Sequence, residues 1–212
     1  MLNLKISNNG AMQGLLNQLD FERLPLPDAD LLFWQQVDLG RPYDSVLQEL
    51  MDTTDWRQEE ITVYGKSYLQ PRLSAWHGDL SYSYSGIRLE PLPWTRTLLD
   101  LKARVEALTE HEFNSVLLNY YRNQNDSMGM HCDDERELGS QPAIASLSLG
   151  YERTFLLKHK TRKDLKTTRL ALPQGSLLLM QGDTQQYWRH GINKVRHPCE
   201  PRVNLTFRTV RT

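Results

Sequence analysis

The strongest constraint on the fold is a change of hydrophobic period near residue 114. Before it, Leu98, Leu101, Val105 and Leu108 recur at spacings of three and four, which predicts an amphipathic helix over residues 94–111. After it the period falls to two, and Gly, Asp, Asn and Pro separate the alternating segments. These segments are 114–121, 143–150, 153–160, 167–173, 175–181 and 202–210. One helix followed by several short strands predicts an α+β chain whose C-terminal half is a β-sandwich or jelly roll.

Length suggests one domain with a less regular N-terminal part. The chain has 212 residues, enough to bury a substantial core. Residues 1–93 are interpreted as an N-terminal extension, and residues 94–212 as the core with its supporting helix. The polar, proline-interrupted stretch 1–55 has no assigned role. We expect the two parts to form one compact, monomeric domain.

Charge and cysteine content exclude several classes of protein. With 25 Lys and Arg against 26 Asp and Glu, the net charge is −1, which excludes a globally basic nucleic-acid coat but not a local basic groove. Two cysteines cannot form a disulfide framework, and no apolar stretch reaches the roughly 18 residues that a membrane span needs. The N-terminus lacks the pattern of a signal peptide. We therefore expect a reducing, cytoplasmic setting and no membrane partner.

The segment GMHCDDERELG, residues 129–139, gathers ionisable side chains between two glycines. One interpretation is a solvated turn, because Asp and Glu are common in loops. The other starts from His131 and Asp133, since an imidazole and a carboxylate one residue apart can reach the same metal ion. Of the other histidines, only His190 lies among strand-like residues. Two histidines and one carboxylate are typical of non-haem Fe(II) oxygenases, whereas structural zinc sites normally use more thiolates.

The last alternating segment places polar side chains on one face of a predicted strand. Those polar residues are Arg202, Asn204, Thr206 and Arg208. On an exposed sheet, such arginines would pair with neighbouring carboxylates. Inside a barrel mouth, their planar guanidinium groups would suit a small dianion. Asn119 and Tyr121 share one face of segment 114–121 and could contact the same ligand.

Three segments together resemble one known family. NSVLLNYYRNQNDSMGMHCDDERELG, IASLSLG and PRVNLTFR are similar to the AlkB family of Fe(II)- and 2-oxoglutarate-dependent dioxygenases, in particular to the branch that contains the human AlkB homologues two and three. Upstream, QPRLSAWHGDLSYSYSG resembles that family's nucleotide-recognition lid. The resemblance implies a double-stranded β-helix (jelly roll) core with N-terminal helices and a β-hairpin lid.

The same resemblance implies Fe(II) as cofactor, with 2-oxoglutarate and O2 as co-substrates. It places the metal on His131, Asp133 and His190. The matching co-substrate positions are Asn119, Tyr121, Arg202, Asn204 and Arg208. We expect Arg202 to hold the distal carboxylate and Arg208 to act nearer the metal, as a catalytic residue. The implied reaction removes N-methyl groups from bases such as N1-methyladenine and N3-methylcytosine in DNA or RNA, single or double stranded, and yields succinate and formaldehyde.

Substrate contacts are expected near the metal and in the lid. Glu135 matches a carboxylate beside the target base, where it could attract the positive charge of a methylated base. The lid contributes Trp76, Tyr82, Tyr84 and Ser85. Its aromatic residues could stack on a flipped base; the alternative is cross-strand packing in a hairpin. Tyr64, in VYGK, stands where one relative has a phenylalanine wedge.

A basic run, residues 157–169, is the predicted contact with the phosphate backbone. Such runs are often only solvated surface, but the rest of this chain is close to neutral. The basic residues of the run are Lys158, Lys160, Arg162, Lys163, Lys166 and Arg169. Its one histidine, His159, is interpreted as a loop residue.

The remaining members of the acidic segment have other expected roles. Cys132 lies between the two metal ligands and should face away from the ion by alternation. Asp134 and Arg136 should tie down the loop, and Glu137 is interpreted as a solvated turn residue.

Two other function classes stay open. A dioxygenase acting on a protein or a small molecule would not need the basic run and the lid aromatics. A non-catalytic binding jelly roll would not need an intact set of metal ligands and arginines. Because the chain has both sets, a nucleic-acid repair dioxygenase is the leading hypothesis.

Overall fold

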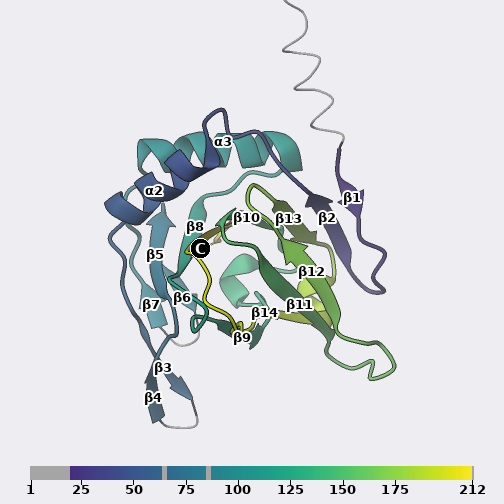
Figure 1. Cartoon of the computed structure of the whole chain (residues 1–212). Coiled ribbons are helices and arrows are strands. Elements are labelled where there is room, and N and C mark those ends of the chain that lie inside the picture. Colours follow the sequence, from purple (N-terminus) through teal and green to yellow (C-terminus); the bar gives the residue numbers. More distant parts are fainter. Residues whose placement is uncertain (1–19, 64–65, 85–86, 212) are drawn as a thin grey trace, which may run out of the picture.

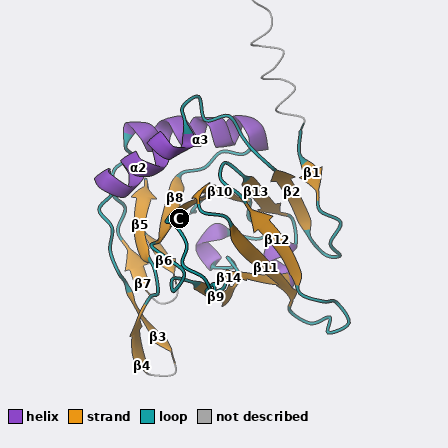
Figure 2. Cartoon of the chain, viewed as in Figure 1, coloured by secondary structure: helices purple, strands orange, loops and turns teal. Residues whose placement is uncertain are grey.

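Two antiparallel β-sheets face each other, and two helices cover the outer face of the larger sheet (Figure 1). The computed structural model describes residues 20–63, 66–84 and 87–211. Within these ranges, the side chains of residues 61–66 and 82–89 are not described. Figure 2 shows that strands dominate and that the longer helices lie together at the top. Among the described residues, no helix is both long enough and apolar enough to cross a membrane.

The larger sheet has seven strands. In spatial order they are β1 (Glu22–Arg23), β2 (Asp30–Trp34), β13 (Leu177–Gln181), β10 (Ile144–Gly150), β15 (Arg202–Arg208), β8 (Ser115–Tyr121) and β5 (Leu73–Gly78). Strands β2 and β5 come from the first 93 residues, so the sheet is continuous across the division between extension and core that the sequence suggested.

The smaller sheet and two hairpins complete the β-structure. The smaller sheet has the order β12 (Thr168–Leu172), β11 (Arg153–His159), β14 (Trp188–Ile192) and β9 (Met128–His131). The hairpins pair β3 (Glu60–Val63) with β4 (Lys66–Leu69) and β6 (Tyr82–Tyr84) with β7 (Ile87–Leu89). Every alternating segment of the sequence forms a strand, and the facing sheets confirm the jelly-roll prediction.

The helices of the described residues are α2 (Tyr43–Thr53), α3 (Arg96–Thr109) and the short α4 (Thr184–Tyr187), with a 3-10 turn, η1, at Arg136–Leu138. The predicted helix is confirmed as α3. It begins where Thr95 Oγ1 accepts a hydrogen bond from the Leu98 N–H, 3.2 Å away, which satisfies an amide that would otherwise lack a partner. It ends at Glu110, whose φ of 58° is left-handed. Helix α2 lies in the stretch that the sequence left unassigned.

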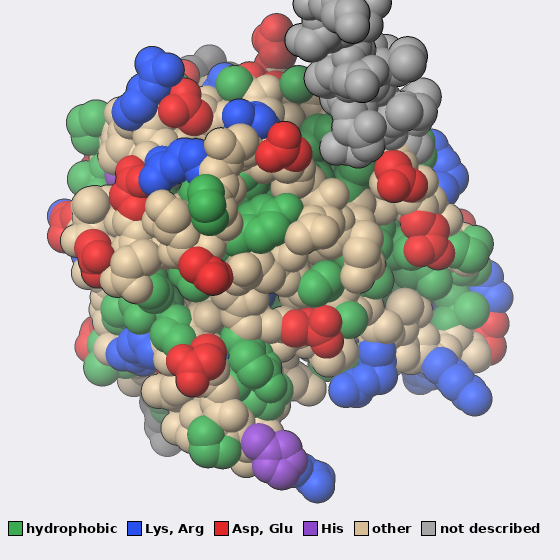
Figure 3. All heavy atoms as spheres, turned by 45° about the horizontal axis from the view of Figure 1, so that its top comes forward, with side chains coloured by type: hydrophobic (Ala, Val, Ile, Leu, Met, Phe, Trp, Pro, Cys, Tyr) green, Lys and Arg blue, Asp and Glu red, His purple; other side chains and the backbone are tan. Residues whose placement is uncertain are grey.

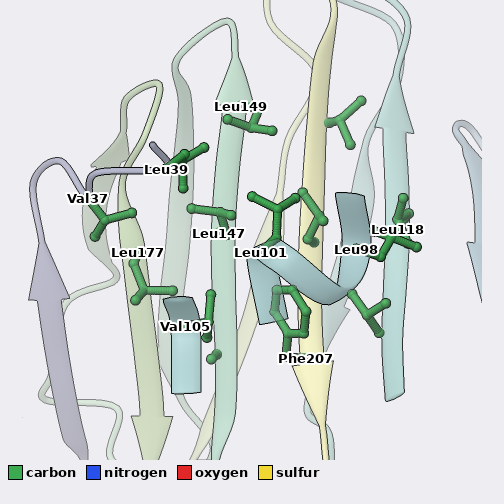
Figure 4. Packing of buried hydrophobic residues seen from close by; sticks show 14 of the residues in the cluster. Val37, Leu39, Leu98, Leu101, Val105, Leu118, Leu147, Leu149, Leu177 and Phe207 are labelled. Atoms are coloured by element: carbon green, nitrogen blue, oxygen red, sulfur yellow. The ribbon is translucent and has the colours of Figure 1, made fainter. Parts of the chain in front are cut away.

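Two apolar layers explain why the sheets pack as they do. Figure 4 shows Leu98, Leu101 and Val105 of α3 against Phe207 and its neighbours on the larger sheet. The opposite face of that sheet packs a second apolar cluster against the smaller sheet. Since alternate residues of β15 face the helices, its other residues face the space between the sheets. The fold thereby directs the polar face of β15 inward.

Charged side chains are mixed on the helical side of the molecule. Figure 3 brings this side forward, and basic and acidic residues are interspersed over it without an extended patch of either sign. This distribution agrees with the net charge of −1. The described residues of the helical side therefore offer no broad basic surface to a polyanion.

We predict that Phe207→Ala destabilises the fold strongly. Phe207 is fully buried, and its ring centroid lies 6.0 Å from that of Phe113. Truncation of a buried Phe costs about 3–5 kcal/mol of unfolding free energy. Urea denaturation measures this loss, with Leu99→Ala on the exposed side of α3 as control. A loss from Phe207→Ala no larger than that of the control would contradict the packing described here.

Candidate active site

The three predicted metal ligands converge between the sheets. His131 ends β9 and pairs with His190 of β14, and the centroids of the two imidazole rings are 4.3 Å apart. Asp133 lies two residues beyond β9, and its Oδ2 is 3.7 Å from His190 Nε2. One ligand atom from each residue lies within 4.8 Å of the others. A single ion can therefore contact all three side chains after small adjustments.

The protonation states of these residues suit metal binding. Burial lowers the pKa of both histidines, that of His190 to about 3. Burial alone would raise the pKa of Asp133, but Arg208 and the two histidines reverse this effect and bring it to about 2. His131 Nδ1 lies 2.9 Å from the Gly129 carbonyl, which can only accept, so Nδ1 carries the proton and Nε2 keeps its lone pair. At neutral pH the site thus presents two neutral imidazoles and one carboxylate.

Arg208 and Gln185 orient Asp133. The Arg208 Nη2 donates a 2.8 Å hydrogen bond to Asp133 Oδ1, and both side chains are buried. The Asp133 N–H donates to Gln185 Oε1 over 3.0 Å. These bonds leave Asp133 Oδ2 without a hydrogen-bond partner among the described residues. That oxygen is the one on the side of His190, so it is available to an ion.

Arg202 lines the same cavity as the three candidate ligands and could bind an anion there. Its Nη2 donates to Ser148 Oγ over 2.9 Å, while Nε and Nη1 are buried without hydrogen-bond partners among the described residues. Its guanidinium carbon lies 5.1 Å from the centroid of the Tyr121 ring. Burial lowers the Arg202 pKa to about 10. Unsatisfied buried donors are costly, so the cavity wall here suits a carboxylate, which can accept two parallel hydrogen bonds.

All the predicted metal and co-substrate residues line one cavity. Those residues are His131, Asp133, His190, Asn119, Tyr121, Arg202, Asn204 and Arg208. Phe155, Leu172 and Met180 supply apolar wall. Asn204 is fixed in place because its Nδ2 donates to Ser146 Oγ, 2.8 Å away. The cavity therefore combines a metal-binding corner with a polar cradle for a small anion.

Two buried arginines beside the cavity were not predicted. Arg72 Nε donates to Asn119 Oδ1 over 2.7 Å. Arg153 lies 5.6 Å from the Tyr121 ring centroid, and its Nη2 donates to the carbonyls of Asp126 and Asn193. The alternation of RTFLLKH puts Arg153 on the same face as the buried Phe155, and this is the signal that could have identified it.

The lid prediction is wrong for Trp76. It lies in β5 of the larger sheet, is 3% exposed, and belongs to the apolar cluster between the sheets. Its indole N–H donates to the Leu80 carbonyl over 3.0 Å. Strand pairing of β5 with β8 holds the residue in the core, so its ring cannot stack on an extrahelical base.

The other lid residues lie outside what the structure describes. Tyr64 and Ser85 fall in the gaps, and the side chains of Tyr82 and Tyr84 on β6 are not described. Glu135, near the metal ligands, has one carboxylate oxygen, Oε2, shielded from solvent. Its contact with a base stays a prediction.

The predicted basic hairpin is formed by β11 and β12, but Lys160 does not belong to its exposed charges. Lys158, Arg162, Lys163, Lys166 and Arg169 are exposed. The Lys160 Nζ instead contacts Asp134 Oδ2 at 3.2 Å and the Gln185 carbonyl at 2.8 Å. This difference arises because the end of β11 lies near both the loop after β9 and α4, each of which places one acceptor within reach of the amine.

Several smaller predictions can be compared with the structure. Cys132 faces away from the cavity as predicted. It is not among the residues that line the cavity, and its Sγ donates to Asp134 Oδ2 at 3.0 Å. Asp134 ties the loop to Lys160, while Arg136 is exposed. His159 is a buried strand residue and not the predicted loop residue, since its imidazole packs edge-on against Trp188 with centroids 5.0 Å apart.

A jelly roll with two histidines and one aspartate around an open metal position defines the class of non-haem iron oxygenases. The family model of the 2OG-Fe(II) oxygenase superfamily matches residues 42–208. Alpha-ketoglutarate-dependent dioxygenase alkB homolog 3 of Mus musculus is 44% identical over 182 residues, which cover 82% of this chain and 63% of that protein. DNA oxidative demethylase ALKBH2 of Mus musculus is 38% identical over 178 residues, covering 79% and 74%. The chain therefore belongs to the AlkB family within this superfamily.

Solved structures agree on the fold. OsALKBH1 has a TM-score of 0.59 at 17% identity, covering 89% of this chain and 99% of that chain. An oxidoreductase of the 2OG-Fe(II) oxygenase family from Burkholderia pseudomallei has a TM-score of 0.54 at 14% identity, covering 79% and 78%. Fe(II) and 2-oxoglutarate, the predicted cofactor and co-substrate, are those of the superfamily. The chain spans 61–63% of the length of the alkB homolog 3 proteins that it matches.

We predict that Asp126→Asn destabilises the loop before β9 in a pH-dependent manner. Burial alone would raise the pKa of Asp126, but its hydrogen bonds with Arg122 lower it overall. Because the folded pKa lies below the unfolded value of about 3.9, this carboxylate stabilises the fold above that pH, and the contribution is lost as the pH falls through the folded pKa. Urea denaturation of both proteins should show a difference at pH 7 that shrinks below about pH 4. An equal difference at both pH values would contradict this assignment.

Proposed function

We propose that the protein oxidatively demethylates N-alkylated bases in DNA, such as N1-methyladenine and N3-methylcytosine. In the proposed reaction 2-oxoglutarate is converted to succinate, and the methyl carbon leaves as formaldehyde. The observation that carries this proposal is the joint presence, in one cavity, of the His–Asp–His set and a buried Arg202 with two spare donors. The name of the relative that is 38% identical, DNA oxidative demethylase ALKBH2, supports the choice of DNA.

The residues present fit the cofactor and the co-substrate. His131, Asp133 and His190 would hold Fe(II), since their ligand atoms are close together and in the forms that bind metals. When bound, the metal with 2-oxoglutarate supplies the oxidising chemistry. The chain itself supplies the unsatisfied donors of Arg202 for the distal carboxylate and the Arg208 charge that keeps Asp133 ionised. Phe155, Leu172 and Met180 give the cavity an apolar wall, which would offer water no hydrogen-bond partners beside the reacting atoms.

The surroundings of the cavity are consistent with an extended nucleic-acid substrate. In Figure 1 the β3–β4 hairpin and the β11–β12 loop extend toward the lower edge of the molecule, on either side of β9 and β14 in this view. The β11–β12 hairpin carries exposed lysines and arginines, which suit phosphate groups. Glu135 provides a carboxylate next to the metal loop, and such a charge would favour cationic methylated bases over neutral ones.

The proposal predicts repair of a methylated oligonucleotide by the reconstituted protein. The protein is loaded anaerobically with Fe(II) and 2-oxoglutarate and then exposed to air with a single-stranded DNA that carries one N1-methyladenine. Mass spectrometry should detect the unmodified base, and formaldehyde should form in equal amount. The His131→Ala variant is the control and should form neither product, because it lacks one metal ligand.

Other outcomes of this experiment separate the alternatives. Repair of methylated RNA, with no repair of DNA, would keep the proposed reaction and change only its substrate. Succinate without repair of either would leave a dioxygenase for a protein or a small molecule and would exclude the proposed substrate. If no succinate forms with any of these substrates, the reaction itself is excluded and a binding jelly roll becomes the better hypothesis.

Arg202→Met should weaken 2-oxoglutarate binding. The substitution keeps most of the side-chain volume but removes the buried donors. Hydrogen bonds to charged groups contribute about 1.5–3 kcal/mol, so the KM for 2-oxoglutarate should rise roughly 10- to 100-fold, while kcat changes less. Initial rates of succinate formation measure both constants, and Arg202→Lys should recover part of the affinity through its charge. An unchanged KM would show that the distal carboxylate binds elsewhere.

A further inference from the structure

Asp133 differs from the two histidines in how its main chain is held. His131 and His190 lie on paired strands, β9 and β14. Asp133 lies beyond the end of β9, between that strand and η1, so no strand ladder fixes its backbone. A loop ligand must be ordered by other contacts, because freezing a loop residue costs conformational entropy. The loop therefore needs an anchor outside its own sequence.

Two residues from other elements hold this loop. Gln185 of α4 is 2% exposed and accepts the Asp133 N–H at its Oε1, 3.0 Å away. Lys160, directly after β11, donates from Nζ to Asp134 Oδ2 at 3.2 Å and to the Gln185 carbonyl at 2.8 Å. Lys160 therefore contacts both the loop and the residue that binds the loop. The three elements form one connected hydrogen-bond network around the peptide that carries the ligand.

We infer that Lys160 and Gln185 are positioning residues that set the metal affinity of the site by fixing the Asp133 loop. This inference rests on the proposed function in one respect, namely that Asp133 binds the metal. Arg208 fixes one carboxylate oxygen of Asp133, and Gln185 fixes its peptide. Together they direct the other oxygen toward His190. Residues that orient metal ligands commonly change metal affinity 10- to 100-fold when they are replaced.

The charge of Lys160 has a second consequence for the loop. Asp134 places another carboxylate one residue from the ligand, and Lys160 neutralises it through a direct ion pair. Lys158, two residues earlier and within β11, is exposed. The two lysines therefore have separate roles, with Lys160 ordering the metal loop and Lys158 free to contact phosphate groups. Lys158 is therefore a matched control only two positions away in sequence.

The test measures metal binding without nucleic acid or turnover. Mn(II) is titrated into the apoprotein, and free Mn(II) is followed by electron paramagnetic resonance. Lys160→Met should raise the Kd for Mn(II) about 10- to 100-fold. Lys160→Arg should recover affinity, since a guanidinium keeps the charge and offers several donors. Lys158→Met should leave the Kd unchanged and weaken only oligonucleotide binding. Unchanged Mn(II) affinity in Lys160→Met would overturn the inference.

Two further variants guard against a simple folding defect. Asp134→Asn removes the ionic partner of Lys160 at a side chain that is 57% exposed, so the fold should tolerate it, and it should reproduce the loss of affinity. Gln185→Leu should also weaken Mn(II) binding, because it removes the acceptor of the Asp133 N–H. The thermal midpoints of the apoproteins identify any global destabilisation. Wild-type affinity in a folded Asp134→Asn variant would overturn the role of Lys160.

The Mn(II) titration tests the role of Lys160 separately from the repair of methylated DNA. If the parent protein binds Mn(II) and the Lys160 variant binds it more weakly, the inference holds even if methylated DNA is not repaired. If the parent protein does not bind Mn(II) at all, the metal assignment fails, and the proposed function and the inference are overturned together.

Discussion

The buried ion pair between Arg208 and Asp133 is the interaction on which the site depends. It joins the last residue of β15, in the larger sheet, to the loop that follows β9 in the smaller sheet, across 75 positions of sequence. Both partners are almost completely buried. Removal of one partner would leave an uncompensated buried charge, which typically costs 3–5 kcal/mol. The pair therefore links the closure of the two sheets to the orientation of a candidate metal ligand.

The interior around the cavity has more positive than negative charge. Among the described residues, the buried arginines are Arg72, Arg153, Arg202 and Arg208, whereas the buried carboxylates are Asp126 and Asp133. Such an arrangement is costly without a counter-ion, because charges in a low-dielectric interior are poorly solvated. A bound dianion would compensate it, so binding of 2-oxoglutarate to the folded chain should also stabilise the fold. In this protein, the same buried arginines would therefore affect both the stability of the core and the binding of the co-substrate.

Strand β15 shows how one short segment serves both core and site. Its odd-numbered residues pack under α3, and its even-numbered residues face the cavity. Neighbouring strands β8 and β10 hold it on both sides, so its side chains cannot rotate away from these faces. The rigidity that the site requires comes from this central position in the sheet.

The sequence by itself determined the fold class, the helix α3, and half of the residues that line the cavity. These follow from local patterns, because alternation along a strand decides which side chains share a face. The candidate metal set could be proposed from the sequence, since His131 and Asp133 are two positions apart and His190 was the only other histidine in a strand-like context. The structure brings the three side chains together. The resemblance to the AlkB family added the roles of these residues.

Only the tertiary structure decided where Trp76 lies, which charges are buried, and how the metal loop is held. Trp76 is in the core because β5 pairs with β8, and no local pattern shows this pairing. Lys160 reaches Asp134 across 26 positions, and Gln185 reaches Asp133 across 52. Such contacts depend on the path of the chain between the two residues, whereas periodicity reports only on each residue's immediate neighbours. A lysine in a basic run therefore looks like a phosphate contact in the sequence and becomes part of the metal loop's anchor in the folded protein.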